Sequence, residues 1–400
     1  MKKFYMFVLT GIMLLITTGA YFYENSYEVP KYNAPTFNIE SKKFGTIKDM
    51  QFIKYAENPI LIILSSTREG DDEYSNLHYL DVEKGEVGHI GKFESHKYLN
   101  NHVTLPYTLN QPQIIAFTPK GYITFPYQQK TKAEYLKDNH HLEKEILNFK
   151  DSTHVTVEYS IAFSKEGHSN IYNYNFYSGL NNLFGYNDSS NFSTVYLGSS
   201  PIIKPVSYTE NEILYIAPKK GKLNLYSFKT SYKKSLLNKP IIENVVNVEN
   251  DFKSQKLIGF TLKDSTTDKL DIFYANALGD EPKKIIDTIE FNKDKNGQIP
   301  DIDYLRIGRN EFMIYTSYDY NGKGFLKIKN FNDSSKDMTI HDKNIFGPLR
   351  VGTYYNFDEN IKDSKELYLI LYLTDDESET KIKLYNINEE TTEDITDMIL

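Results

Sequence analysis

The sequence predicts an all-β protein: a β-propeller of about seven four-stranded antiparallel blades, preceded by an N-terminal apolar helix. Three observations predict it. Aromatic residues make up 14 % of the 400 residues although Trp is absent, and this composition favours strands. A two-strand unit recurs along the chain at intervals of about 50 residues, which is the range of propeller repeats. An uncharged apolar run stands at the N-terminus, ahead of the repeats.

The N-terminal segment, residues 1–23, resembles an export signal. Lys2 and Lys3 precede an uncharged run over residues 4–23. A helix of that length crosses a hydrocarbon layer of about 30 Å, and Tyr21 to Tyr23 would then lie at the outer interface. Alternatively, the small residues before Tyr21 allow cleavage after Ala20. Both outcomes predict an extracytoplasmic protein, either anchored to the cell membrane through residues 4–23 or secreted after cleavage.

The segment after this run, residues 24–45, reads as an extended linker. Pro30 and Pro35 lie among Asn and Tyr residues with no sustained period. The repeats follow over residues 46–400. Their opening strands are apolar on both faces: residues 60–64, 114–117, 161–163, 213–216, 258–260, 312–315 and 367–371. Their second strands alternate apolar and polar residues: 77–81, 171–175, 223–227, 272–276, 326–330 and 382–386.

This unit favours a propeller because its two strands need different environments. An opening strand that is apolar on both faces must be covered on both sides, whereas an alternating strand needs one covered face. Sheets packed face to face around an axis satisfy both demands and leave short, protected edges. Two stacked β-sandwiches or a two-domain α+β chain remain alternatives. The seven predicted units are residues 58–93, 112–149, 153–186, 211–240, 256–287, 310–342 and 366–400.

Two further expectations concern the ends of the repeat and its second unit. The strand candidate over residues 47–55 precedes the first unit and has no partner of its own, so we expect it to pair with the last unit and close the ring. Residues 132–149 carry apolar residues at near-helical spacing, which predicts a helical insertion in the second unit.

The succession of an apolar strand, a turn and a strand such as Leu223 to Ser227 resembles the WD40-like and TolB-type propeller repeats of exported bacterial proteins. The resemblance covers nearly all of residues 46–400. It lies in the cadence of the strands, since the Trp-Asp signature of WD40 blades is absent. It therefore implies the fold and assigns no catalytic residue.

Motifs for catalysis are missing from the sequence. There is no nucleophile elbow, no phosphate-binding loop and no His-Glu-x-x-His pair. The histidines are scattered: His78 lies on an alternating strand, His89, His96 and His102 follow the first unit, and His140 and His141 are sequential neighbours. Acidic clusters at residues 71–73, 375–379 and 389–390 fall between predicted strands, as charged hairpin tips do. No catalytic or organic cofactor-binding residue is predicted.

One segment, Asn292 to Asp303, resembles the calcium loop of EF-hand and dockerin-like proteins. Asn292, Asp294 and Asn296 supply oxygen ligands at loop positions 1, 3 and 5, Gly297 permits the sharp turn, and Asp303 closes the loop. Asn at position 1 and Asp at position 12 depart from the usual pattern. The alternative is a polar loop between units, with Asn296 and Gly297 forming its turn. The sequence thus predicts a Ca²⁺ site at these four oxygen-bearing residues.

The composition restricts the classes of function. Because the net charge is −8, nothing neutralises phosphates and nucleic acid is excluded as a partner. The absence of Cys excludes disulfides and thiolate chemistry. The sequence favours a non-catalytic binding or scaffolding module that meets a protein or peptide partner at the cell envelope. Two alternatives remain open: a hydrolase or lyase on carbohydrate or peptide with its site at the propeller channel mouth, and an accessory subunit of a membrane complex.

Overall fold

A computed structural model describes the chain from Pro35 onward, and its strands account for nearly all of the secondary structure. The described residues are 35–53, 59–94, 103–104, 113–118, 121–126, 142–145, 152–157, 160–165, 170–175, 192–196, 204–208, 212–229, 240–251, 256–263, 269–276, 283–290, 299–307, 310–319, 321–355, 366–376 and 379–400. The all-β prediction is confirmed.

The first half of the chain forms sheets 1 to 4, each antiparallel and each made of strands consecutive in sequence. Sheet 1 contains β1 (Ile39–Ser41), β2 (Gly45–Phe52), β3 (Ile60–Glu69), β4 (Asp72–Asp81) and β5 (Glu86–Glu94). Sheet 2 contains β6 (Val103–Thr104), β7 (Gln113–Thr118), β8 (Gly121–Pro126) and β9 (Leu142–Glu145). Sheet 3 contains β10 (Ser152–Val157), β11 (Ser160–Lys165), β12 (Asn170–Asn175) and β13 (Phe192–Tyr196). Sheet 4 contains β14 (Lys204–Tyr208), β15 (Glu212–Lys219) and β16 (Lys222–Lys229).

The second half forms sheets 5 to 7 with the same meander order. Sheet 5 contains β17 (Val245–Asp251), β18 (Lys256–Leu262), β19 (Lys269–Asn276) and β20 (Lys284–Glu290). Sheet 6 contains β21 (Ile302–Ile307), β22 (Asn310–Tyr318), β23 (Gly324–Asn330) and β24 (Met338–Ile340), with the short helix η2 (Ser334–Lys336). Sheet 7 contains β25 (Asn344–Tyr355), β26 (Glu366–Asp376), β27 (Glu379–Asn386) and β28 (Thr391–Asp394), and α2 (Thr396–Ile399) follows it.

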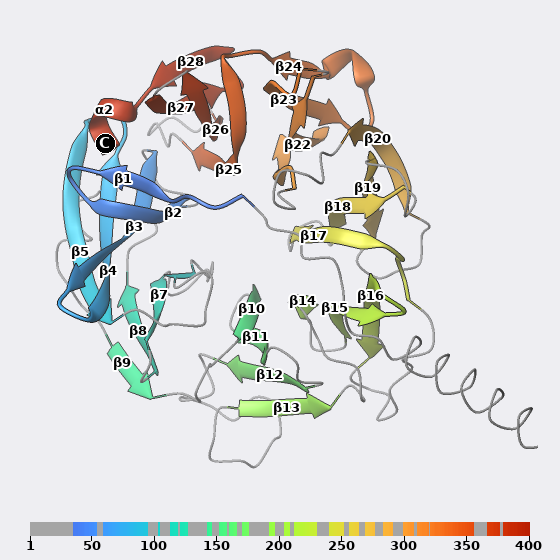
Figure 1. Cartoon of the computed structure of the whole chain (residues 1–400), viewed down its shortest axis with the longest axis horizontal. Helices are drawn as coiled ribbons and strands as arrows, with labels where there is room; N and C mark the ends of the chain where they lie inside the picture. The colour runs from blue at the N-terminus through green and yellow to red at the C-terminus, as the bar shows by residue number, and fades with distance from the viewer. Residues whose placement is uncertain are drawn as a thin grey trace, which may run out of the picture.

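The sheets follow one another around a common axis, with the first long strand of each sheet nearest the axis (Figure 1). In sheets 2 to 7 every predicted opening run lies in the second strand and every predicted alternating run in the third; in sheet 1, which has the extra strand β1, they lie in β3 and β4. Sheet 6 shows why. The middle of β22 is buried over six consecutive residues, whereas β23 alternates between buried and half-buried positions. The two environments inferred from the sequence are therefore present.

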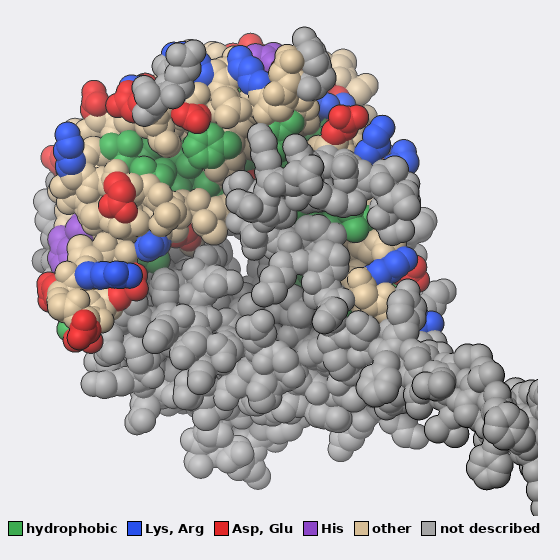
Figure 2. Space-filling view, viewed as in Figure 1, with side chains coloured by type: hydrophobic (Ala, Val, Ile, Leu, Met, Phe, Trp, Pro, Cys, Tyr) green, Lys and Arg blue, Asp and Glu red, His purple; other side chains and the backbone are tan. Residues whose placement is uncertain are grey.

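Apolar clusters fill the spaces between neighbouring sheets. One cluster joins sheets 4 and 5, a second joins sheets 5 and 6, and a third joins sheets 6 and 7. Among the described residues, the largest cluster joins sheet 7 to sheet 1. Charged side chains lie along the outer circumference of the described sheets (Figure 2). The core thus lies between the sheets, as face-to-face packing requires.

Two junctions between consecutive sheets share a polar contact as well. Tyr315 on β22 and Lys327 on β23 are cross-strand partners, and both bind Asp287 of the preceding sheet, at 2.5 and 3.0 Å. The next junction repeats the arrangement: Tyr372 and Lys383 are cross-strand partners. Their hydroxyl and ammonium groups lie 3.5 and 2.7 Å from Asp342.

The prediction that residues 47–55 pair with the last unit is wrong. This segment contains β2, which pairs with β3 inside sheet 1, in a register that places Met50 opposite Ile63. The physical reason is that sheet 7 already receives its fourth strand, β28, from the C-terminal end of the chain. The short connection from β2 to β3 also favours a local antiparallel pairing.

A clasp between the two ends of the described chain joins sheets 7 and 1 instead. The Lys42 N–H donates to the carbonyl of Leu400 at 3.1 Å, and the Ser41 hydroxyl donates to the carbonyl of Ile399 at 2.6 Å. Ile399 is fully buried in the cluster that these two sheets share. Residues 41–42 and 399–400 are therefore held side by side without forming a continuous sheet.

Two other expectations differ from the structure. Within residues 132–149, predicted as helical, β9 is a strand that pairs with β8, so strand pairing outweighs the local helical spacing. The last part of the predicted linker is packed: Pro35 is buried, and Phe37 is 2 % exposed. Apolar burial therefore begins about ten residues earlier than the lack of period suggested.

Candidate functional site

Several of the strands nearest the axis share a structural irregularity. The register of β2, β17 and β25 against the neighbouring strand shifts next to Asp49, Asn247 and Arg350, respectively. Such bulges turn a side chain out of the regular alternation and occur often beside functional sites. We call the polar side chains gathered on these inner strands the inner rim. It includes Asp301, just before β21, and Asp303, on β21.

Arg350 is the centre of the inner rim. Its Nη2 lies 2.8 Å from Oδ1 of Asp49, and its Nε donates to the Met50 carbonyl at 3.1 Å, so it binds both the side chain and the backbone of sheet 1. Its Nη1 donates to the Leu349 carbonyl at 2.7 Å and lies 3.8 Å from Asp301. One guanidinium therefore connects the inner strands of sheets 1, 6 and 7.

Asp301 and Asp303 bind the free backbone edge of the neighbouring inner strand. Oδ2 of Asp301 accepts the Leu349 N–H at 2.7 Å, and Oδ2 of Asp303 accepts the Val351 N–H at 3.2 Å. The second oxygens accept the N–H groups of Ile302 and Tyr304, at 3.0 and 2.7 Å. These carboxylates therefore accept hydrogen bonds from backbone N–H groups on the edge of β25 that faces away from β26.

The electrostatics of the rim follow from burial and from this one cation. Burial raises the pKa of Asp301, although Arg350 and the two backbone N–H groups oppose the change. Burial would lower the pKa of Arg350, but the attraction of Asp49 and Asp301 outweighs it and leaves the pKa raised. Glu249 on β17 also acts on Asp301 and raises its pKa further. The guanidinium therefore stays charged at any physiological pH.

The start of the described chain lies against this rim. A Cβ atom on Gly347 would meet the Pro35 ring at 2.8 Å, so the chain approaches β25 closely there. The Arg350 guanidinium carbon lies 5.2 Å from the centre of the Phe37 ring, within the range of a cation–π contact. The segment from Pro35 to Phe37 thus covers part of the inner rim with its own side chains.

Of the predicted calcium ligands, only the last is described. Asn292, Asp294 and Asn296 lie outside the described residues. Asp303 is half-buried at the inner rim, with its carboxylate oxygens bonded to the Tyr304 and Val351 N–H groups. No group of three or more His, Asp or Glu suited to a metal ion occurs in the part of the chain that the structure describes. The calcium loop remains a prediction.

The acidic clusters that the structure describes lie at turns. Asp71 is exposed between β3 and β4, Asp72 is exposed at the start of β4, and Glu389 and Glu390 are exposed between β27 and β28. Asp375 is exposed near the end of β26. These positions agree with the interpretation of the clusters as charged hairpin tips.

Sequence reasoning missed one arrangement of histidines. It placed His89 in a connection after the first unit, whereas His89 lies on β5 directly opposite His78 on β4. The two positions are nearly symmetrical about the Lys84–Gly85 turn, and this symmetry is the signal that could have revealed the pair. His96, His102, His140 and His141 lie outside the described residues.

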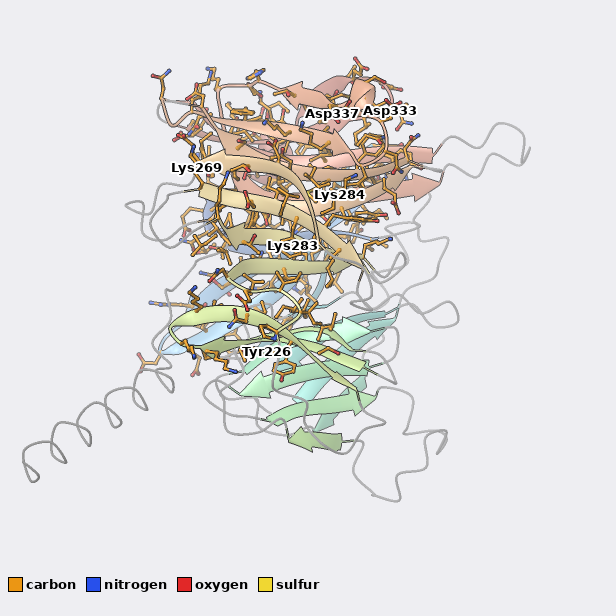
Figure 3. The ribbon with its side chains drawn as sticks, turned by 90° about the vertical axis from the view of Figure 1, so that its right-hand side faces the viewer. Tyr226, Lys269, Lys283, Lys284, Asp333 and Asp337 are labelled. Atoms are coloured by element: carbon orange, nitrogen blue, oxygen red, sulfur yellow. The ribbon has the colours of Figure 1, made fainter. Side chains whose placement is uncertain are left out.

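The outer edges of the sheets carry charged and paired side chains. In Figure 3, Lys269, Lys283 and Lys284 of sheet 5 and Asp333 and Asp337 of sheet 6 lie on the side that faces the viewer. Lys329 lies 3.0 Å from Asp337 in an ion pair. Large apolar side chains are rarely exposed there: among the described residues, the exposed ones are Val87 (41 %) and Ile285 (42 %). Charged edges of this kind discourage non-specific pairing between sheets.

No helix in the described part of the chain has the length and apolar character that a membrane crossing needs. The helices described there are η2 and α2, of three and four residues. The predicted anchor, residues 4–23, lies outside the described residues.

Comparison with known proteins gives matches in structure alone. No protein-family model matches the chain, and no curated protein matches it in sequence. A mutant of prolyl oligopeptidase B from Galerina marginata has 8 % identity and a TM-score of 0.45, over 85 % of this chain and 47 % of that one. The chain thus spans about half the length of that enzyme.

Two smaller proteins are also similar. TolB from Acinetobacter baumannii has 10 % identity and a TM-score of 0.34, over 84 % of this chain and 69 % of that one. The β-propeller domain of the Trilobed protease from Pyrococcus furiosus, described as having an open velcro topology, has 11 % identity and a TM-score of 0.41. That match covers 76 % of this chain and 86 % of that one. A TolB protein is thus among the similar structures, and the sheet topology defines the fold of this chain.

Proposed function

We propose that the chain is an exported β-propeller of seven blades, closed into a ring and tethered to the cell membrane by residues 4–23. Cleavage near Ala20 would release the same domain. The ring acts as a non-catalytic binding or scaffolding module at the cell envelope, with a protein or peptide as its partner. The basic start and apolar run support export, and the net charge of −8 argues against nucleic acid.

The observation that carries this proposal is the use of the inner-rim charges. Asp49, Asp301, Asp303 and Arg350 each bind the backbone or a charged group of a neighbouring sheet. A catalytic carboxylate needs an oxygen that is free to exchange a proton with a substrate, and here those oxygens accept backbone N–H groups. The partner therefore binds to the faces and loops of the ring, where propellers carry their binding residues.

Capture of partners from envelope membranes tests the proposal. The full-length chain with a C-terminal affinity tag is cross-linked in cells, extracted and analysed by mass spectrometry, beside a chain whose residues 4–23 are replaced by an unrelated membrane helix. Recovery of the same envelope protein with both chains supports a binding module. Recovery with the natural segment alone favours the accessory subunit, whose helix itself makes the contact. A chain found in the cytoplasm would overturn the proposal.

One observation favours the enzymatic alternative: carboxylates from three sheets converge on the inner rim, and burial raises the pKa of Asp301. A carboxyl whose pKa is raised, placed near a second carboxylate, is the pair of groups that glycosidases use. Incubation of the purified chain with glycan and peptide libraries tests this alternative, with Asp301→Asn as the matched variant. Turnover by the natural chain that is lost in the variant would establish an enzyme. Equal, background turnover would exclude catalysis by Asp301.

A further inference from the structure

The histidine pair of sheet 1 is placed by a bulge. Along β4 and β5, Leu77 lies opposite Gly91 and the next residue, His78, lies opposite His89, so Ile90 is an extra residue in β5. Ile90 is 1 % exposed and turns into the core. Without this extra residue, His78 would lie opposite Ile90, and the two imidazoles would project from different faces. The bulge therefore brings two imidazoles together on one face.

The two imidazoles are close enough to share a ligand. Their ring centres lie 5.1 Å apart at an interplanar angle of 62°, an edge-on arrangement. The Phe44 ring lies 4.8 Å from the ring of His78 and forms an apolar wall on one side. His78 is half-buried and His89 is exposed, so the site is open to solvent. Neither imidazole donates or accepts a hydrogen bond with any residue in the described ranges.

The protonation of His78 suits metal binding. Burial, and then the neighbouring His89, lower the pKa of His78 to about 4, so this imidazole is neutral at physiological pH. A neutral imidazole offers a nitrogen lone pair to a cation, whereas a protonated one repels it. No carboxylate acts on His78 strongly enough to oppose this shift. Two adjacent imidazoles on one face can therefore offer their nitrogen atoms to a single ion.

We infer that His78 and His89 form a two-histidine site for a first-row transition-metal ion of the Zn²⁺, Ni²⁺ or Cu²⁺ class. These ions prefer imidazole nitrogen, and Cu²⁺ binds such ligands most tightly. Two protein ligands leave the remaining coordination positions to water or to a ligand from a partner. The site is separate from the predicted calcium loop, which offers oxygen ligands, and it does not depend on the proposed function of the ring.

Calorimetric titration of the full-length chain with Cu²⁺, Ni²⁺ and Zn²⁺ at pH 7.5 tests the inference. We expect one site per chain for each ion, at least tenfold weaker in both His78→Ala and His89→Ala. His341→Ala is the matched control, because His341 is exposed and packs against Phe325 rather than against another histidine. That variant should bind as the natural chain does.

Two further measurements separate loss of the site from loss of the fold. Urea unfolding without metal should be nearly unchanged in His89→Ala, since His89 is exposed. The electron paramagnetic resonance spectrum of bound Cu²⁺ should show two imidazole nitrogens in the natural chain and one in either variant. Absence of binding to the natural chain, or binding that persists unchanged in both variants and so lies on other histidines, would overturn the inference.

Discussion

The junctions between consecutive sheets and the junction between sheets 7 and 1 are held together differently. Sheets 5 and 6, and likewise 6 and 7, are linked by the chain and share an Asp that binds a cross-strand Tyr and Lys. Sheets 7 and 1 are linked by no nearby segment of chain. They share the terminal clasp, the Arg350 contacts and the largest apolar cluster.

This difference follows from the entropy of closing the ring. Consecutive sheets stay close because a short connection joins them, so modest contacts suffice to align them. The closing junction brings together residues more than 300 positions apart, and its contacts must offset the ordering of the whole chain between them. The closing junction uses backbone, buried charge and apolar packing together, and the junction of sheets 6 and 7 also has backbone contacts, through Asp301 and Asp303. If this is right, breaking contacts of the closing junction should lower the free energy of unfolding more than breaking contacts of a consecutive junction.

Removal of residues 396–400 should have the largest effect. It deletes the buried Ile399 and the carbonyl partners of Ser41 and Lys42. Loss of a buried Ile alone costs about 2–5 kcal/mol, so we expect a loss near the upper end of that range. Urea unfolding followed by circular dichroism measures it. Glu393→Ala, at an exposed position on β28, is the control. Equal stability of the shortened chain would mean that the clasp does not hold the ring.

Arg350→Met should cost about 3–5 kcal/mol, because it leaves the nearly buried Asp49 without its counter-charge. The matched variant at a consecutive junction is Lys327→Met. Its partner, Asp287, is 22 % exposed and retains the Tyr315 hydroxyl, so we expect about 1 kcal/mol. Chemical denaturation of the two variants under the same conditions gives the comparison. A larger loss for Lys327→Met would reverse the order of the two junctions.

Tyr315→Phe and Tyr372→Phe compare the two consecutive junctions with each other. The Tyr315 hydroxyl lies 2.5 Å from Asp287, whereas the Tyr372 hydroxyl lies 3.5 Å from Asp342. A hydrogen bond to a charged group contributes about 1.5–3 kcal/mol, so Tyr315→Phe should lose about that much and Tyr372→Phe clearly less. Thermal unfolding of the two variants resolves the difference. Equal losses would show that the longer contact is no weaker.

Acid should weaken the consecutive junctions. Burial alone would raise the pKa of Asp287 and Asp342, but hydrogen bonds from Tyr315 and Lys327, and from Lys383, leave each pKa lowered. A lowered folded-state pKa gives stability that is present above the unfolded value of about 3.8 and is lost as the pH falls below it. Urea unfolding between pH 7 and pH 3 measures this loss. Asp287→Asn should reduce the slope below pH 4, and an unchanged slope would contradict the assignment.

Calcium should have the smallest effect, at the junction of sheets 6 and 7. If residues 292–303 bind Ca²⁺, the ion would be held next to Asp303, which accepts the Val351 N–H across that junction. We expect heat on titration of the natural chain, none with Asp294→Ala, and a rise in melting temperature that grows logarithmically with Ca²⁺ concentration. Asn321→Ala, in the exposed turn between β22 and β23, is the control. Absence of heat in both samples removes the calcium site.

Much of the fold was predictable because the residue pattern of each repeat depends on whether one or both faces of a strand are buried. The burial of β22 on both faces and the alternation of β23 follow directly from their residue patterns. The assignment of β2 failed because its pattern shows that it is a strand and says nothing about its partner. The helix expected over residues 132–149 failed because spacing alone cannot weigh a helix against pairing with β8.

The inner rim was less predictable. Asp301 and Asp303 precede or begin β21, where the sequence suggests polar loop residues and, for Asp303, a calcium ligand. Their bonds to Leu349 and Val351 connect residues 48 positions apart, and no local signal reports such a contact. The histidine pair was missed for a smaller reason: a single extra residue, Ile90, changes which side chains face each other across two strands.

By itself, the sequence determined the strands, their repetition and the side of each strand that is buried, because these depend on the hydrophobicity of neighbouring residues. Only the tertiary structure decided how the last sheet meets the first, which charges converge on Arg350 and which histidines lie opposite each other. Those contacts join residues that are distant in the chain or depend on one position of register, and packing of the whole molecule selects them.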